Sequence, residues 1–284
     1  MLLMVRAGAK QLRSMLSNKI ILILITLLFT LFAKGEEVLV IKQWHLSPGT
    51  KTTDIAAGRK LPQFTNQLDI YYKLTELVNG RSALTLIQEG CEGEVTNSSK
   101  LDHYGWTYEL LRPQKESKDF RDILAFMPLK MKVKFDDKVR ALCSDTKELI
   151  KKSLLAFSDL RGSSGFYQRL KEFKAKNDDK NYKSYEAAAV PKDKLGKVDA
   201  IEYERGQMLK SIKDIEDSLA ERNDLIVDLV KKTIKDNPVV VIGGLHVKDL
   251  TEKFKKEKIR FTIYSPKGYE EQDELLLEKF KKGL

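Results

Sequence analysis

Apolar and polar stretches alternate along the chain in a way that predicts strands separated by helices. Near-continuous runs of valine, isoleucine and leucine are typical of strands that are buried on both faces of a parallel sheet. The candidate strands cover residues 37–48, 82–90, 138–145, 238–246 and 259–266. Apolar residues three and four positions apart predict helices at 61–80, 117–133, 145–157, 199–235, 247–258 and 270–283, with amphipathic segments continuing from 157 to about 176. This order predicts an α/β fold: a mostly parallel central sheet with helices on both faces and helical insertions.

Two stretches depart from this alternation. Residues 91–114 look irregular, and residues 174–197 are polar and charged, which is typical of an insertion or a loop. We find no internal repeat and no convincing domain boundary. We therefore predict one domain over residues 36–284, with a helical and polar insertion around residues 95–200. Either Ser144 or Asp145 is expected to cap the helix that follows the third strand.

The N-terminus has the three parts of a signal peptide. A basic segment is followed by 14 uncharged, mostly apolar residues at 20–33, with small residues at Ala33 and Gly35. The apolar segment is shorter than the roughly 20 residues that span a bilayer comfortably. We expect residues 1–35 to be removed after Gly35 and the mature chain to be exported, to a periplasm or to the outside. The alternative is an uncleaved membrane anchor formed by residues 20–33.

Charge and cysteine content narrow the possible partners. Lysine and arginine number 51 against 41 acidic residues, a net charge of +10, and five of the basic residues lie in the first 35. Elsewhere lysines alternate with acids, and no cluster of arginines with aromatic residues predicts a nucleic-acid surface. The expected partner is a peptide or a small molecule, with membrane contact only through an uncleaved N-terminal segment. Cys91 and Cys143 could form one disulfide in an oxidising compartment.

Four chemically versatile residues end or follow the candidate strands. They are His45, Glu89, Asp145 and His246. Ligands bind parallel α/β sheets outside the carboxyl ends of the strands. Two imidazoles with one or two carboxylates can hold a divalent transition metal, which can activate water and polarise a carbonyl.

Each of these residues also has a purely structural interpretation. His45 could pack beside Trp44, and His246 could cap the following helix. Glu89 could be an exposed loop carboxylate, and Asp145 could be a helix cap. The convergence of several strand ends favours a site over any one of these alternatives.

The long candidate helix at 199–235 provides an independent signal. Its apolar stripe is formed by Met208, Ile212, Ile215, Leu219, Ile226 and Leu229. Between Leu219 and Ile226 the stripe skips one turn, where Arg222 and Asn223 stand. Polar groups are costly to bury unpaired, so a core-facing arginine requires a carboxylate or a substrate anion. The simpler alternative is a salt bridge that fastens the helix to the sheet.

These motifs resemble the TraB/TIKI family, which has an Arg-Asn pair on a helix, then a strand, a Gly-x-x-His motif, a helix and a strand. Arg222 and Asn223 match the pair, and Gly243–His246 match the motif. The family also has an earlier Gly-x-x-His and a strand that ends in glutamate, where this chain has His45 and Glu89. Lys42 stands in place of the glycine of that first motif.

The resemblance implies a fold similar to the ChaN-like and erythromycin-esterase superfamily, whose TIKI members are proteases dependent on manganese or cobalt. It predicts an exported metal-dependent hydrolase that acts on peptide bonds, with His45, Glu89 and His246 as metal ligands; zinc or iron are alternatives. Arg222 would hold a carboxylate or a developing oxyanion, and Asn223 would fix the geometry. Glu92 is a further acid–base candidate. The rival hypothesis, favoured by Lys42, is a non-catalytic protein that binds a small ligand or haem.

Overall fold

A computed structural model describes residues 36–44, 62–95, 100–101, 106–107, 131–132, 134–271 and 274–284, with the backbone alone at 100–101 and 106–107. The chain divides into two units, Met1–Glu37 and Val38–Leu284, and the fold below is that of the second unit. The predicted signal peptide at 1–35 and nearly all of the predicted helix at 117–133 lie outside the described residues. Within the described part of the chain, every helix is too short or too polar to span a bilayer.

A six-stranded, mostly parallel sheet forms the centre of the domain, in the order β3-β6-β2-β7-β1-β8. Its parallel strands are β1 (Val38–Gln43), β2 (Leu84–Gln88), β6 (Val139–Ser144), β7 (Val239–Gly243) and β8 (Phe261–Tyr264). The short edge strand β3 (Glu92–Glu94) runs antiparallel to β6. A separate two-stranded sheet pairs β4 (Lys100–Leu101) with β5 (Trp106–Thr107). The predicted α/β class is confirmed, although the stretch predicted to be irregular contributes β3.

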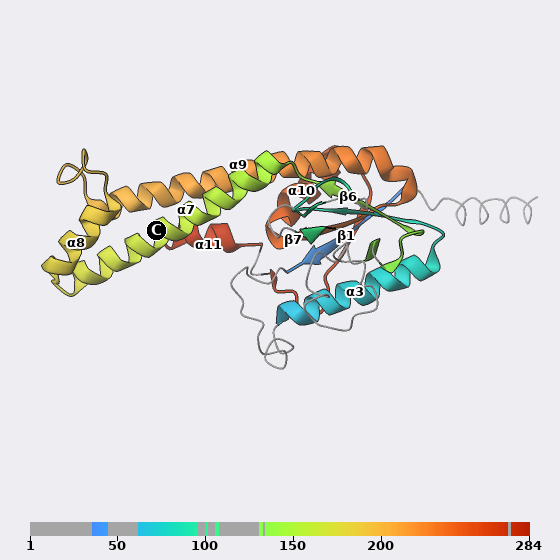
Figure 1. Ribbon diagram of the computed structural model, residues 1–284, viewed down its shortest axis with the longest axis horizontal. Coiled ribbons are helices and arrows are strands. Elements are labelled where there is room, and N and C mark those ends of the chain that lie inside the picture. The colour runs from blue at the N-terminus through green and yellow to red at the C-terminus, as the bar shows by residue number, and fades with distance from the viewer. Residues whose placement is uncertain are drawn as a thin grey trace, which may run out of the picture. The chain divides into compact units, whose positions relative to one another are not determined.

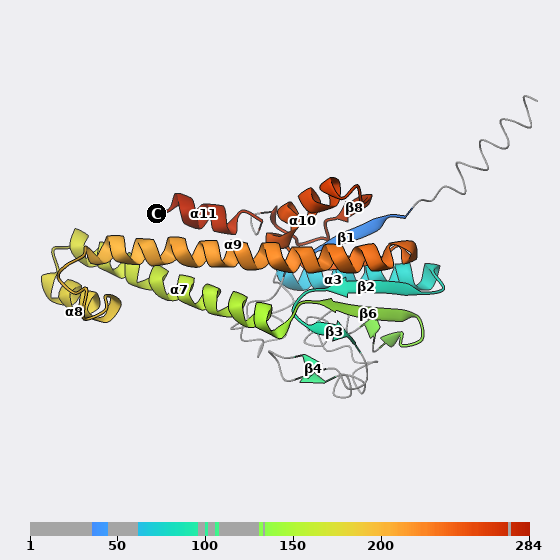
Figure 2. The same ribbon diagram turned by 90° about the horizontal axis from the view of Figure 1, so that it is seen from above.

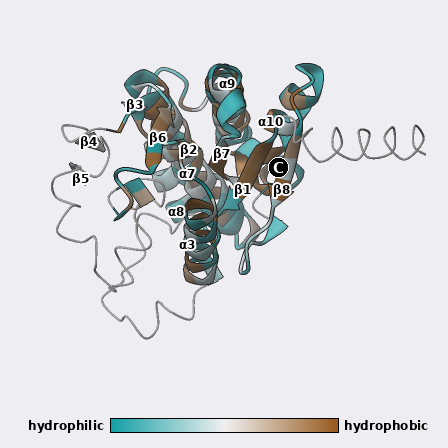
Figure 3. Cartoon of the chain, turned by 90° about the vertical axis from the view of Figure 1, so that its right-hand side faces the viewer, coloured by the Kyte–Doolittle hydropathy of each residue, from teal (hydrophilic) through white to brown (hydrophobic). Residues whose placement is uncertain are grey.

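Helices cover both faces of the sheet, as predicted (Figures 1 and 3). Helix α3 (Pro62–Gly80) packs on one face through Ile70, Leu74 and Val78. The opposite face is covered by α9 (Ala200–Thr233) and α10 (Gly244–Lys256). The strands are therefore buried on both sides, which explains their near-continuous apolar sequences.

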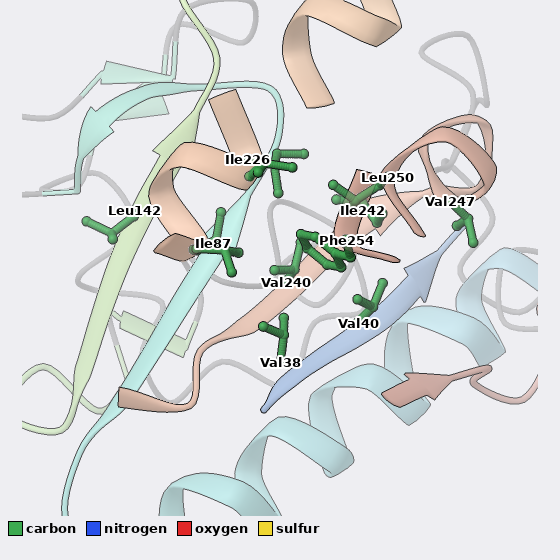
Figure 4. Packing of buried hydrophobic residues seen from close by; sticks show 12 residues of the cluster. Val38, Val40, Ile87, Leu142, Ile226, Val240, Ile242, Val247, Leu250 and Phe254 are labelled. Carbon is green, nitrogen blue, oxygen red and sulfur yellow. The ribbon is translucent and has the colours of Figure 1, made fainter. Parts of the chain in front are cut away.

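The core between the sheet and helices α9 and α10 is assembled from short aliphatic side chains and one aromatic ring (Figure 4). Val38, Val40, Ile87, Leu142, Val240 and Ile242 extend from the strands, and Ile226, Val227, Val230, Val247, Leu250 and Phe254 extend from the helices. Because side chains alternate along a strand, the next residue of this face after Ile87 is Glu89. The functional candidates therefore lie where this apolar core ends.

Helix α9 continues beyond the sheet beside α7 (Lys147–Ala175), as Figure 2 shows. Met208, Ile212 and Ile215 of α9 pack against Ala156 and Leu160 of α7. The last helix, α11 (Leu276–Lys282), joins the same cluster through Leu277. A single turn of 3-10 helix, η2 (Ile234–Asp236), links α9 to β7.

Of the two interpretations of residues 174–197, an insertion or a loop, the loop is wrong for the first half. Helix α7 extends to Ala175, and α8 (Asp179–Ala189) follows after a short turn. The Asp178 side chain caps α8 by accepting a hydrogen bond from the Asn181 N–H. On the inner side of α8, the ring of Tyr185 lies 5.1 Å from that of Phe173. A charged sequence with few aromatic anchors thus forms a surface helix.

Candidate functional site

The carboxyl ends of the parallel strands lie at one edge of the sheet, and Glu89 stands there directly after β2. One of its carboxylate oxygens accepts a hydrogen bond from the backbone N–H of Gly243, the last residue of β7. The other oxygen, Oε2, lies 2.7 Å from Nε2 of His246. Both side chains are at least nine-tenths buried. Glu89 is therefore not the exposed loop carboxylate of the structural alternative.

His246 lies in the first turn of α10, not at the end of a strand. The helix begins at Gly244, three residues before the predicted start, because Gly243 already has the extended backbone of an N-cap residue. Gly243 provides no side chain to cap the helix, and the His246 side chain makes no cap hydrogen bond. The prediction that His246 ends a strand is wrong, and so is the alternative that it caps the helix.

Asn223 determines how the His246 ring presents its two nitrogens. The amide nitrogen of Asn223 donates to Oδ2 of Asp249 at 2.8 Å and to the His246 carbonyl at 3.3 Å. Its amide oxygen, which can only accept, therefore faces Nδ1 of His246 at 2.7 Å. Nδ1 must carry a hydrogen, so the lone pair of the neutral ring is on Nε2 and faces Glu89. A proton or a cation is needed between Nε2 and the carboxylate oxygen.

Arg222 holds two carboxylates from different strands. Its Nε and Nη2 donate to the two oxygens of Asp145 at 2.8 and 2.7 Å. The same Nη2 donates to Oε2 of Glu89 at 2.9 Å. Burial alone lowers the pKa of Arg222, but the hydrogen bond to Asp145 and the charges of Glu89 and Asp145 outweigh it and raise the pKa. The guanidinium therefore stays charged.

Asp145 is the main partner of Arg222 in this network. Asp145 neutralises Arg222 through a bidentate pair, and a hydrogen bond from the Gly90 N–H further stabilises the carboxylate. Glu89 shares the Nη2 group of Arg222 with Asp145, and the oxygen that accepts from it, Oε2, also faces Nε2 of His246. The guanidinium and the imidazole therefore meet at one carboxylate oxygen.

The break in the apolar stripe of α9 is explained by this network. Arg222 is 8% exposed and Asn223 is fully buried, as the skipped turn predicted. Asp145 belongs to the network, and the N-cap of α7 is instead Thr146, which accepts from the Leu149 N–H. The predicted capping by Ser144 or Asp145 is therefore wrong.

Two further candidates from the sequence have different outcomes. His45 follows Trp44 and lies outside the described residues. Glu92 is exposed on the edge strand β3, opposite Ser144. The structure thus places Glu92 outside the buried network and leaves the position of His45 as a prediction.

Lys42 is accommodated at the end of β1 as one member of a buried ion pair. Its side chain is nearly buried, and Nζ lies 2.6 Å from Oε1 of Glu274. The ammonium also lies 5.2 Å from the centre of the Tyr269 ring, whose hydroxyl donates to the same Glu274 oxygen at 3.0 Å. The charge of Lys42 is thus neutralised by the C-terminal segment.

Sequence reasoning missed two residues, Asp249 and Glu274, and left one disulfide pairing undecided. Asp249, which orients Asn223, stands three residues after His246 on the same helix face, a spacing that could have revealed it. Glu274 is 232 positions from Lys42, and nothing in the sequence links them. The pairing of Cys91 with Cys143, which the sequence left open, is present as a disulfide.

The described residues meet part of the requirement for a metal site. Among them, no three histidine, cysteine, aspartate or glutamate side chains are arranged to hold a metal. Nε2 of His246 and the Glu89 carboxylate nonetheless face each other with the donor chemistry that zinc, manganese, cobalt and iron accept. Asn223 orients the ring from behind, as hydrogen-bond partners of ligating histidines do. A metal site at this place would need further ligands beyond these two donors.

Comparisons of the chain with protein-family models, with curated proteins and with solved structures found no match.

Proposed function

We propose that the chain is an exported metal-dependent hydrolase that acts on peptide bonds. The observation that carries this proposal is the buried 2.7 Å contact between Nε2 of His246 and Oε2 of Glu89, with Nδ1 of the ring fixed by Asn223. A buried imidazole and carboxylate at the carboxyl edge of a parallel sheet occupy the usual ligand position of this fold class. The resemblance to the TraB/TIKI family supports the reaction class.

In this proposal Glu89 and His246 hold a divalent metal, manganese or cobalt by resemblance, and His45 is the third ligand. A bound metal of this kind supplies an activated water and polarises a carbonyl. Asn223 keeps the Nε2 lone pair directed at the site. Arg222 holds the carboxylates of Glu89 and Asp145 in place. Glu92 retains only the role of an exposed acid–base candidate at the rim.

A second candidate function is a non-catalytic protein that binds a small ligand or haem on the same scaffold. The observation that favours it is the Lys42–Glu274 pair, which puts charged side chains at the end of β1, where the family has glycine. In that case the site would bind a ligand at the same sheet edge without turnover.

The two functions are separated by comparing the full chain with E89Q, H246A and the surface variant E252Q. Glu252 is exposed on α10, the helix that carries His246, so E252Q matches the charge change of E89Q outside the site. We expect E89Q and H246A to lose bound metal and to hydrolyse a fluorogenic peptide library at least about 100-fold more slowly, with E252Q unchanged.

Metal content is measured by elemental analysis after incubation with manganese, cobalt, zinc or iron. Equal metal content and equal peptidase rates in all four proteins would contradict the proposal. Metal or haem bound by the parent chain and lost in H246A, without peptide hydrolysis by either protein, would favour the binding function instead.

A further inference from the structure

The disulfide between Cys91 and Cys143 lies next to the two carboxylates that Arg222 holds. Cys91 follows Glu89 by two residues, and Cys143 precedes Asp145 by two. The bond therefore joins the chain after β2 to the end of β6, where these carboxylates leave the sheet. Both cysteines are buried.

Backbone contacts connect the disulfide directly to the carboxylates. The Asp145 N–H donates to the Cys91 carbonyl at 3.0 Å, and the Gly90 N–H donates to the Asp145 carboxylate. Gly90 has a φ of 85°, a left-handed conformation that lets the chain turn between Glu89 and Cys91. Asp145 and the Glu89–Cys91 turn thus hold each other through hydrogen bonds beside the covalent bond.

The ladder between β3 and β6 extends the same connection. Gly93 pairs with Cys143 and Glu92 with Ser144 in this antiparallel register. The Gln88 amide donates to Sγ of Cys91 at 2.9 Å, and the Ser144 hydroxyl donates to the Gln88 carbonyl at 3.0 Å. The ladder between β3 and β6 is only three residues long, so its hydrogen bonds alone provide little restraint on the turn. The disulfide is the strong link in this set.

We propose that the Cys91–Cys143 disulfide is a positioning element for the site, and that the oxidised chain is the competent form. The bond fixes the turn after Glu89 against the end of β6, so that Glu89 and Asp145 reach Arg222 together and Oε2 of Glu89 faces His246. This inference rests on the proposed function for its consequence on catalysis. Its geometric part, the placement of Glu89 against His246, does not.

The experiment uses the full chain and compares C91A/C143A with L170A. Leu170 is fully buried on α7, in a cluster with Val190 and Ala200 that contains none of the site residues. L170A should therefore lower the thermal unfolding midpoint and leave the disulfide in place. The two variants can then be compared at temperatures that are equally far below their own midpoints. A second pair, C91V/C143A, keeps more of the buried volume in case the alanine variant does not fold.

The first measurement is the side-chain nitrogen NMR spectrum of the histidines. The chain has only three histidines, and H246A identifies the signals of His246. We expect the Nε2 signal of His246 to move toward that of a solvent-exposed imidazole in the cysteine variants, and to stay in place in L170A. An unchanged His246 signal in the cysteine variants, or an equal change in L170A, would overturn the proposal.

Reduction of the native chain provides the same test without mutation. Dithiothreitol transfers two electrons and two protons to the disulfide, giving two thiols and the cyclic disulfide of the reagent. The His246 signal should move on reduction and return on reoxidation of the parent chain. A signal that is unaffected by complete reduction, verified by thiol labelling, would contradict the proposal.

Peptide hydrolysis provides the second measurement. Displacement of a catalytic carboxylate should lower kcat about 10- to 100-fold with a smaller change in KM, whereas L170A should retain both. Retained kcat in the folded cysteine variants would also overturn the proposal. If E89Q and H246A hydrolyse peptides as fast as the parent chain, the proposed function fails, and the His246 signals still decide the role of the disulfide.

Discussion

Glu204 is a buried carboxylate on α9 in an environment unlike that of Glu89. It is 3% exposed, and the hydrogen bond with Ser163 of α7 only partly opposes the effect of burial. Burial raises the pKa of Glu204 above its ordinary value of 4.5. The folded chain therefore binds this proton more tightly than the unfolded chain does. The resulting contribution to stability is present below pH 4.5 and is lost as the pH rises through the folded-state pKa.

We predict that E204Q is more stable than the parent chain at neutral pH by about 1 kcal/mol, because glutamine fills the same space without a buried charge. The free energy of unfolding, measured in urea, should differ little between the two proteins near pH 4. The difference should grow as the pH rises and then level off. If the stability of E204Q ran parallel to that of the parent chain across this pH range, the prediction would be contradicted.

Arg222 illustrates what a single position in the sequence can and cannot predict. The skipped turn in the apolar stripe correctly predicted that Arg222 and Asn223 face the core, because helical spacing is a local property. The partners of Arg222 are 133 and 77 residues away, and only the strand order brings Glu89 and Asp145 to the same guanidinium. The sequence indicated that Arg222 needs a carboxylate or a substrate anion, but it did not identify Glu89 and Asp145 as the partners.

At the scale of elements, helix α7 contains two glycines that its packing does not require. Gly162 and Gly165 are exposed within the helix, and a Cβ added at either would meet nothing within 4 Å. Glycine inside a helix costs roughly 0.5–1 kcal/mol relative to alanine. We predict that G162A and G165A each raise the free energy of unfolding by about this amount, measured by chemical denaturation.

Gly268 provides the matched contrast. Its φ is +76°, and a Cβ there would lie 2.4 Å from the carbonyl oxygen of Pro62, at the start of α3. G268A should therefore destabilise the chain under the same conditions. Destabilisation by G162A or G165A would show that the open faces of α7 are constrained in some other way.

Element boundaries show where local patterns lose their predictive power. The five parallel strands and the long helix α9 were predicted because apolar runs and helical spacing are strong signals. The start of α10 was misplaced because the apolar run Val239–Ile242 continues through Gly243 and Gly244 to Leu245, so the change from strand to helix leaves no mark in hydropathy. Helix α8 was missed because it has no fully buried residue.

At the scale of the whole molecule, β1 is joined to the segment just before α11 by contacts across nearly the full length of the sequence. Lys42 pairs with Glu274, which stands two residues before the start of α11, and Tyr269 lies beside this pair. Leu277 of α11 is buried in the cluster that also includes Leu245, the neighbour of His246. The C-terminal segment therefore contacts both motif regions, β1 before His45 and α10 around His246.

The same contacts give Lys42 a structural role. A glycine at this position would leave Glu274 with Tyr269 as its partner and remove a nearly buried ammonium. A buried charge that loses its partner is costly, whereas an exposed pair such as Lys248–Glu278 contributes little. The two pairs tie the same C-terminal segment, so they can be compared directly.

We predict that K42M loosens α11 while K248A does not. Loss of a nearly buried charge pair should cost about 1–2 kcal/mol locally, so amide hydrogens of Leu276–Lys282 should exchange roughly 10-fold faster in K42M. Amides of β2 and β6 serve as an internal reference, because the Lys42–Glu274 pair does not involve them. Hydrogen exchange followed by mass spectrometry measures both regions in one experiment. Equal exchange of α11 in K42M and K248A would show that Leu277 and its apolar neighbours hold the C-terminal helix without Lys42.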